Sequence, residues 1–271
     1  MVSLGLLGVA AAPFYVAYVG FTVVDAVLFA SMYWLTLGPG LCVGFHRHFT
    51  HGAFQASPTV RVCLAVLGSM SAQGPLAYWV AVHRRHHELA DEEGDPHSPH
   101  TDGGGWRGLW RAHFGWSLEF GAPNGAHYCP DILREPHLMA VNRRYRTCVA
   151  LGLALPTAVG GLVTGTWTGA LGGLIWGGLV RMFLTSNATW SLNSFCHRFG
   201  QRPFATRDQS HNNAWLALPT LGESWHNNHH AFPHAAAHGH GLKQLDLNYL
   251  AIAALEKLRL VRHVRRARRV G

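Results

Sequence analysis

The run His226-Asn227-Asn228-His229-His230 sets the fold expected of this 271-residue chain, and it repeats the spacing of His83-Arg84-Arg85-His86-His87 far upstream. On an α-helix, positions i, i+3 and i+4 share one face, so each run directs three imidazoles to one side of its helix. Neutral imidazole suits zinc, copper, iron and nickel. The two runs therefore predict a metal centre.

Two shorter pieces of sequence have compatible spacing. His46 and His51 are five positions apart, and a straight α-helix would splay them by roughly 140°. We therefore expect His51 just past a helix end. Asn193 and His197 stand one turn apart on a helix that we expect to continue beyond a membrane span. The candidate ligands are nine histidines, too many for one metal of four to six ligands, so two metals are implied: His46, His51, His83, His86, His87, His197, His226, His229 and His230.

The composition is that of a membrane protein. Charged residues make up 13% of the chain, about half the usual share of a soluble domain. The five cysteines are odd in number and form no C-x-x-C pair, so neither a disulfide framework nor a thiolate zinc site is indicated. Reduced thiols in or facing a cytosol fit best. The net charge of +8 comes from Lys and Arg that all follow Phe45. No base-reading motif accompanies this charge, so we expect no nucleic-acid partner.

Apolar segments predict four transmembrane helices in two hairpins. Residues 2–45 contain one acid and no Lys or Arg. At roughly 20 residues per span, this segment is long enough for two spans, at 2–20 and 24–45. This segment has no basic stretch before its apolar run, which favours a hairpin over a cleaved signal peptide. Residues 148–165 and 167–192 form the second pair. Arg181 interrupts the last span, and we expect it near the inner headgroups of a long helix, although a functional role is the alternative.

The remaining segments, 46–147 and 193–271, are expected to form a cytoplasmic helical cap within a single domain over 1–271. Basic loops and the basic tail place both termini and all histidine clusters on the cytoplasmic side of a cell membrane. Within the cap we expect an interfacial helix over 57–82, a loop over 88–111 and an amphipathic segment over 242–260. The tail, with arginines from Arg259 to Arg269, either lies against anionic lipid or is solvated.

Glu223 forms the chain's single E-x-x-H match, with His226. Di-iron bundles rich in carboxylates use paired motifs of this kind. We therefore expect Glu223 to orient a ligand imidazole from outside the coordination sphere, or to act only as a helix-start carboxylate. The other eleven histidines have no motif, and most are expected on the surface. Three of them, His234, His238 and His240, follow the third cluster in a loop sequence and are not expected to be ligands.

Together these motifs resemble the membrane fatty acyl desaturases, especially the stearoyl-CoA delta-9 type and its bacterial relatives. The resemblance covers nearly the whole chain, because the motifs stand in the family's order: Gly44 to Arg47 with His51, His83 to His87, Asn193 to His197, and Gly222 to His230. It implies four spans and a cytoplasmic cap that holds two irons. It also implies that the nine histidines are iron ligands and that Asn193 supports the centre through a water.

The resemblance further implies O2-dependent removal of two hydrogens from an acyl chain held in a dry tunnel. Gln73, Trp79, Thr189 and Trp190 match positions that bend the chain in the animal enzymes, although ordinary packing near an interface would also explain them. Gly74 and Val82 replace polar residues that hold the CoA head group there. The carrier could therefore be CoA, an acyl carrier protein or a lipid. No haem-binding His-Pro-Gly-Gly segment is present, which implies a separate donor such as ferredoxin or a cytochrome b5-like protein.

We therefore expect a di-iron desaturase that inserts a cis double bond near carbon nine of a saturated acyl chain. One alternative keeps the metals and the superfamily but changes the product, as in a hydroxylase or an acetylenase. Another is a membrane metal transporter, but its histidines would lie within the spans. Zinc could also occupy imidazole-rich sites of this kind.

Overall fold

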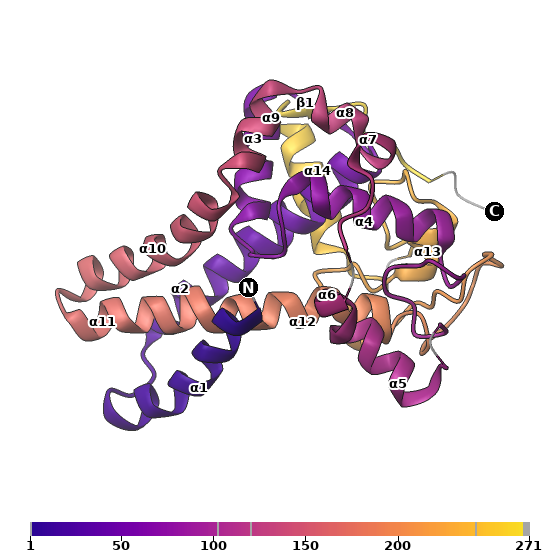
Figure 1. Ribbon diagram of the computed structural model, residues 1–271. Helices are drawn as coiled ribbons and strands as arrows, with labels where there is room; N and C mark the ends of the chain where they lie inside the picture. Colours follow the sequence, from indigo (N-terminus) through magenta and orange to yellow (C-terminus); the bar gives the residue numbers. More distant parts are fainter. Residues whose placement is uncertain (1, 102, 120, 242, 268–271) are drawn as a thin grey trace.

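The computed structural model describes residues 2–101, 103–119, 121–241 and 243–267, and the fold is mostly helical. Long helices extend to one side, and short helices and loops gather at the other (Figure 1). Leu242, the first residue of the expected amphipathic segment, and Arg268 and Arg269 of the basic tail are not among the described residues. We call the part formed by residues 51–143 and 195–267 the cap.

The long helices consist of these segments: α1 (Val2–Tyr18), α2 (Val23–Leu35), η1 (Thr36–Thr50), α10 (Tyr145–Thr164), α11 (Trp167–Gly172), η3 (Gly173–Val180) and α12 (Arg181–Ser194). The second expected pair packs together, through α10 against α11 and η3, whereas α1 packs mainly against η3 and α12. Thr22 starts the second helix through a capping box, because its hydroxyl accepts from the Asp25 amide while Asp25 accepts from the Thr22 amide. Gly165 ends the third helix with φ of 66°, a left-handed conformation that glycine adopts without strain.

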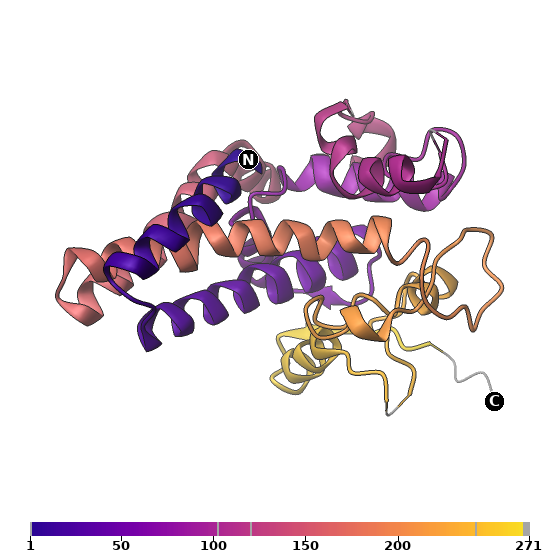
Figure 2. The same cartoon turned by 90° about the horizontal axis from the view of Figure 1, so that it is seen from below.

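Three continuous helices of the described chain are long and apolar enough to cross a membrane: Val23–Thr50, Tyr145–Thr164 and Trp167–Ser194. These contain three of the four expected spans. The first expected span corresponds to α1, which is apolar but has only 17 residues. Figure 2 shows α1 running beside α12, against which it packs.

The expectation for Arg181 is wrong. Its side chain is fully buried instead of reaching headgroups. It donates to the carbonyls of Gly177 at 3.1 Å, Met70 at 2.8 Å and Gly152 at 2.9 Å. These carbonyls come from three different segments, so Arg181 ties the fourth long helix to the third and to the end of α3. The charge is accommodated because hydrogen bonds replace its hydration.

Short elements make up the cap. The expected interfacial helix over 57–82 is two helices, because the backbone breaks at Met70–Pro75, where Gly74 has φ of 107°. The expected loop over 88–111 contains one helix of six residues. The elements are β1 (Gln55–Ala56), α3 (Pro58–Ser69), α4 (Leu76–Leu89), α5 (Gly105–Trp110), η2 (Arg111–Gly115), α6 (Trp116–Glu119), α7 (Gly125–Tyr128), α8 (Pro130–Leu133), α9 (Pro136–Arg143), η4 (Ala214–Leu216), α13 (His226–Ala231), α14 (Leu247–Lys257) and β2 (Val261–Arg262).

Helix η1 is the axis on which the cap is assembled. Helix α3 packs closely on it because Gly40 has no side chain: a Cβ there would lie 2.6 Å from the Leu67 carbonyl carbon. Helices α4 and α14 also contact η1. Strands β1 and β2 pair in an antiparallel ladder, with Gln55 opposite Arg262. The C-terminal segment is thereby fixed to the chain that leaves η1.

Candidate metal centre

The π-helical winding of η1 explains the unusual spacing of His46 and His51. The helix ends at Thr50, and the His51 amide donates to the His46 carbonyl at 3.2 Å, five residues back. This i→i+5 bond is the π-helical pattern, which is frequent at functional sites. It brings two imidazoles together that an α-helix would splay, with ring centroids 4.9 Å apart. His51 lies just past a helix end, as expected.

The other histidines come from α4, α13 and the turn after α12. The H-x-x-H-H run at His83 lies on α4, and the run at His226 lies on α13, so both are helical as predicted. His197 differs from the expectation, because α12 ends at Ser194 and His197 stands in the following turn. Its position there lets the ring turn back toward α13.

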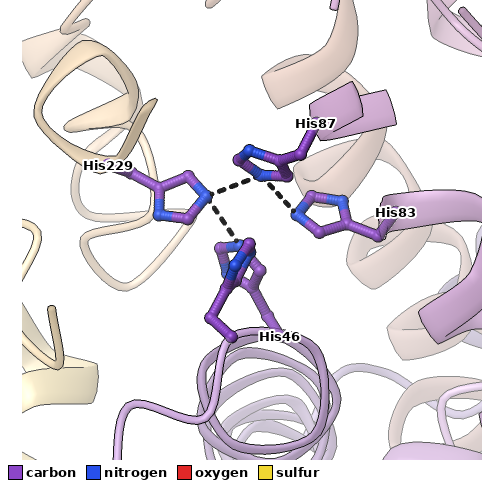
Figure 3. A group of neighbouring side chains, drawn as sticks. His46, His83, His87 and His229 are labelled. Carbon is purple, nitrogen blue, oxygen red and sulfur yellow. Dashed lines mark hydrogen bonds between the residues drawn. The ribbon is translucent and has the colours of Figure 1, made fainter. Parts of the chain in front are cut away.

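The nine candidate histidines form two clusters. We call the first the five-His cluster: His46, His51, His83, His87 and His229. We call the second the four-His cluster: His86, His197, His226 and His230. In each, one nitrogen from every ring lies within 4.8 Å of all the others. In Figure 3, rings from η1, α4 and α13 point toward one another.

The ring nitrogens approach too closely and too often to be explained by hydrogen bonds alone. Nε2 of His229 lies 3.1 Å from Nε2 of His46 and 3.0 Å from Nε2 of His87. In the four-His cluster, Nε2 of His226 lies 3.1 Å from that of His197 and 3.2 Å from that of His230. One proton serves one such contact, so several lone pairs converge without a donor. A metal cation is the group that fits converging imidazole lone pairs.

Orphaned nitrogens support the same conclusion. Nε2 of His51 and Nε2 of His86 are buried without a hydrogen-bond partner among the described residues, although each belongs to a cluster. A buried polar atom without a partner is costly. Each cluster therefore contains a buried nitrogen that lacks a partner and that a bound metal would provide with one. The two clusters together could hold two ions.

Burial keeps most of these imidazoles neutral. It lowers the pKa of His51, His83, His87, His226 and His229 well below the ordinary value, and the neighbouring rings add to the shift. Burial lowers the pKa of His230 to about 4. The neutral ring is the form that ligates a metal. His86 is the exception: burial opposes its charge, but Asp95 raises its pKa above the ordinary value.

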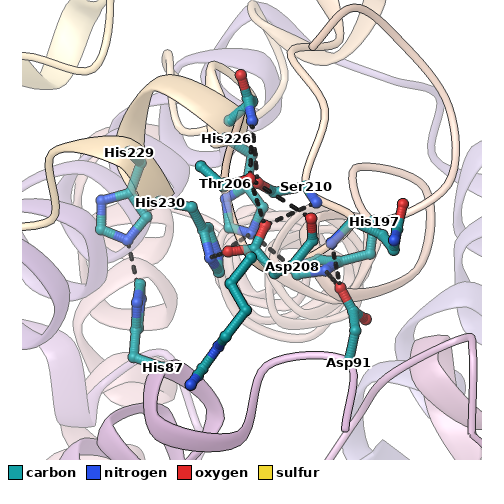
Figure 4. A network of polar contacts seen from close by, with 12 residues as sticks. His87, Asp91, His197, Thr206, Asp208, Ser210, His226, His229 and His230 are labelled. Atoms are coloured by element: carbon teal, nitrogen blue, oxygen red, sulfur yellow. Dashed lines mark hydrogen bonds and ion pairs between the residues drawn. The ribbon is translucent and has the colours of Figure 1, made fainter. Parts of the chain in front are cut away.

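Carboxylates stand behind three rings of the four-His cluster. Nδ1 of His86 lies 2.9 Å from Asp95, that of His197 2.8 Å from Asp91, and that of His230 3.0 Å from Asp208. Figure 4 shows Asp91 and Asp208 beside their histidines. Burial favours the neutral acids, but hydrogen bonds to Asp91 and Asp208, and the charge of His86 beside Asp95, hold the pKa of the three aspartates well below their usual range. Each carboxylate fixes its ring so that Nε2 faces inward.

A different arrangement supports the five-His cluster. Oε2 of Glu223 lies 2.5 Å from Nδ1 of His46, and Oε1 accepts from Arg47 at 2.7 Å and from Asn248 at 2.9 Å. Arg47 is fully buried and also binds Asp246 at 2.9 Å. Glu223 therefore contacts one ring of the five-His cluster, through Nδ1 of His46. It belongs to a network that joins η1 to α14.

Sequence reasoning missed several of these residues. Asp91, Asp95 and Asp208 were not predicted, although Asp91 and Asp95 closely follow the run at His83. His97 and His238 are also buried, not on the surface. Both nitrogens of His238 lack a hydrogen-bond partner among the described residues, and its ring lies 4.5 Å from that of His229. His48 is a third buried exception, and its Nδ1 lies 3.0 Å from the Phe54 carbonyl oxygen.

A cavity of about 720 Å³ leads to both clusters. Its lining includes His46 and His83 of the five-His cluster and His226 of the four-His cluster, together with Asn193. The four residues expected in the tunnel also line it: Gln73, Trp79, Thr189 and Trp190. Thr189 donates to the Gln73 side chain at 3.0 Å, which links α12 to the break before α4.

Comparison with known proteins identifies the family of this chain. The sequence matches the fatty acid desaturase family over residues 6–253. The chain belongs to the fatty acid desaturase family. It is 51% identical to a hex-5-enoyl-[acyl-carrier protein] acetylenase of Moorena producens, over 82% of this chain and 71% of that protein.

More distant relatives carry out related reactions on other carriers. An sn-1 stearoyl-lipid 9-desaturase of Anabaena variabilis is 34% identical, over 87% of this chain and 82% of its own length. An icosanoyl-CoA 5-desaturase of Limnanthes douglasii is also 34% identical, over 94% and 68%. The chain is thus an oxidoreductase of the desaturase family, and its relatives differ in carrier and in product.

Proposed function

We propose that this protein is an acetylenase of the desaturase family, which removes two hydrogens from an alkenoyl chain carried by an acyl carrier protein. The observation that carries the proposal is a cavity that reaches two histidine clusters in a chain half identical to an acetylenase. The expected insertion of a double bond near carbon nine has less support, because the 9-desaturase relatives are only about one third identical.

Two irons are proposed as the resident metals. The five-His cluster would hold one ion and the four-His cluster the other, with Asn193 facing the centre from the cavity wall. When bound, the irons supply the oxidising power of O2 that an unactivated C–H bond requires. The protein's own part is to fix the rings through Glu223, Asp91, Asp95 and Asp208, and to exclude water from the chain.

The cavity supplies the positioning. Trp79 and Trp190 offer flat apolar walls, and the Gln73–Thr189 pair adds a polar point to the lining. A chain held there is desolvated beside His46 and His83. No Lys or Arg is among the described residues that line the cavity. The lining therefore has no cation for a phosphate group, so the head group of the carrier would remain outside the channel.

We also propose that the protein is a multi-pass membrane protein with both termini and the cap in the cytoplasm. With α1 as a fourth span, the three long apolar helices and the basic segments that follow Val23–Thr50 and Trp167–Ser194 support this orientation. Electrons would come from a separate donor of the ferredoxin or cytochrome b5 type.

The test is a product measurement with the full chain in nanodiscs, supplied with ferredoxin, its reductase, NADPH and O2. Substrates are 5-hexenoyl and saturated hexanoyl thioesters of acyl carrier protein and, separately, stearoyl lipid. The mass of each acyl chain reports the reaction. With the native protein we expect loss of two hydrogens from the hexenoyl chain alone. With the His229→Ala variant we expect the mass of every acyl chain to stay the same. Loss of two hydrogens from a saturated chain only would establish the desaturase, and gain of an oxygen the hydroxylase.

The desaturase with a lipid-bound substrate is the second candidate, and one observation favours it. The cavity lining includes Leu6 and Leu118, which are 51% and 70% exposed. An apolar edge of this kind would admit a chain from a bilayer. The stearoyl-lipid substrate in the same experiment therefore decides between the two.

A further inference from the structure

Helix α14 is apolar on two opposite faces, only one of which the protein covers. Its inner face contacts η1, where Ile252 and Asn248 are fully buried. On the other side Leu250 is 56% exposed and Leu258 68%, with exposed Ala254 between them. A helix that is apolar all round is normally buried in protein or in lipid. The outer face of α14 is therefore an apolar surface that no described part of the chain covers.

The segment around η4 is a second exposed apolar segment, and it is bonded to the inner side of α14. Trp215 is 93% exposed and Leu218 is 66% exposed. The Asn248 amide donates to the Leu221 carbonyl at 3.2 Å, which joins this segment to α14. The hydroxyl of Tyr33 donates to the Pro219 carbonyl at 2.5 Å, which joins it to the span Val23–Thr50. The exposed Trp and Leu thus lie beside a helix that is long enough to cross a membrane.

The direction of α14 and the charges after it fit the surface of a bilayer. Figure 1 shows α14 crossing the direction of α12 near the place where the long helices meet the cap. Lys257, Arg259 and Arg262 follow at its end and are exposed. An interfacial helix combines an apolar face with flanking Lys and Arg, which attract anionic lipid. Tryptophan is enriched at the same depth.

We propose that the outer face of α14 and the η4 segment, through Leu250, Leu258, Trp215 and Leu218, lie in the headgroup region of an anionic bilayer. The proposal rests on the membrane location given above. A bilayer is favoured over a second copy of the chain because the Tyr33–Pro219 bond places the surface beside a span. The Lys and Arg residues at its edge would also repel the same residues of another copy.

This contact has a consequence for the five-His cluster. The inner side of α14 begins with Asp246 and Asn248, which hold Arg47 and Glu223, and Glu223 in turn holds His46. The bilayer would therefore support the helix that fixes a ligand ring. The four-His cluster has no such link among the described contacts of α14.

The test measures depth with spin labels, so it does not depend on activity. The background is the full chain with Cys63→Ser, because Cys63 is the exposed cysteine and the other four are buried. Single labels are placed with Leu250→Cys and Leu218→Cys. Glu93→Cys, exposed in the turn after α4, is the aqueous control, and Leu162→Cys, 83% exposed on α10, is the lipid control. Each is studied in nanodiscs that hold one copy in phosphatidylcholine, with and without phosphatidylglycerol.

We expect labels at 250 and 218 to collide several-fold more with O2 than with a water-soluble nickel chelate, relative to the label at 93. Adding phosphatidylglycerol should move both labels deeper into the bilayer. The double substitution Arg259→Glu with Arg262→Glu should remove this effect of the anionic lipid. Labels at 250 and 218 that behave like the label at 93 would overturn the proposal. An aqueous label at 162 would instead show that the membrane location is wrong. Dipolar coupling between labels at 250 in detergent, with aqueous behaviour in nanodiscs, would identify a second copy as the partner.

Discussion

The five-His and four-His clusters contain similar rings but are supported in different ways. Three of the four rings in the second cluster each have their own aspartate, from the 91–95 turn or from Asp208. In the first cluster Glu223 serves His46 and is itself held by Arg47 and Asn248. Damage to one aspartate should therefore remain local. Damage to Glu223 should spread through a shared buried network, since such networks are not additive.

The largest effect should come from removing a ring on which two of the three close nitrogen contacts of the five-His cluster depend. His229 touches His46 and His87 through the same nitrogen. His229→Ala should abolish activity and release metal from the five-His cluster, a loss beyond the roughly 10–100-fold typical of residues outside the coordination sphere. Metal analysis of the purified protein, together with product mass, measures this. His127→Ala is the matched control, because His127 is exposed and belongs to neither cluster. Full metal content in His229→Ala would show that His229 is not a ligand.

Next is the comparison of Glu223→Gln with Asp95→Asn. Both changes keep shape and remove one charge, and both side chains are almost fully buried. Glu223→Gln should weaken metal binding by about 10–100-fold, and it should also lower stability, because Arg47 then keeps only Asp246 as a buried counter-ion. Asp95→Asn should weaken metal binding with a smaller loss of stability. Metal titration and thermal unfolding of the metal-free variants separate the two effects. Equal loss of stability in both would contradict the shared network.

How far the sequence predicted this site follows from the range of each interaction. The helical runs at His83 and His226 were predicted because their spacing is local, and the nine histidines that they helped to identify do form two clusters. Asp208 was missed because its pairing with His230 depends on a loop path that no spacing encodes. His238 and Arg181 were placed at the surface or near headgroups, but tertiary contacts bury both. The π-helical winding of η1 was also missed, although it is what unites His46 with His51.

Acid should destabilise the metal-free protein. The pKa of His230 is lowered to about 4 by burial, against 6.5 in an unfolded chain. Below pH 6.5 the unfolded state therefore binds a proton that the folded state does not, so stability falls as pH falls from 6.5 toward 4. For His230 alone the loss between pH 7 and pH 5 is about 2 kcal/mol. The other rings with a lowered pKa act in the same direction, whereas His86, with a raised pKa, opposes them.

Thermal unfolding of metal-free protein at pH 7 and pH 5 checks this expectation. The buried aspartates do not interfere, because their depressed pKa values contribute stability that is lost only below about pH 4. His230→Gln should reduce the pH dependence, whereas His127→Gln, at an exposed position of α7, should leave it unchanged. An unfolding temperature that is the same at both pH values would show that the rings are not buried neutral.

The smallest effect should come from Asp208→Asn, which sharpens the contrast within the four-His cluster. The Asp208 side chain is 9% exposed, while that of Asp95 is fully buried. The amide oxygen that this substitution introduces could still accept from Nδ1 of His230, in place of Oδ2, while the bond that Oδ1 accepts from the Ser210 amide at 2.9 Å would be lost. The ring would therefore keep its orientation and lose only the nearby charge, which water partly screens at this position. We expect metal affinity to fall by roughly tenfold, the lower end of the range for such residues. Asp208→Ala, which removes the acceptor as well, should cost more than Asp208→Asn. If the two variants bind metal equally, the hydrogen bond from His230 does not orient the ring, and cluster packing alone holds it in place.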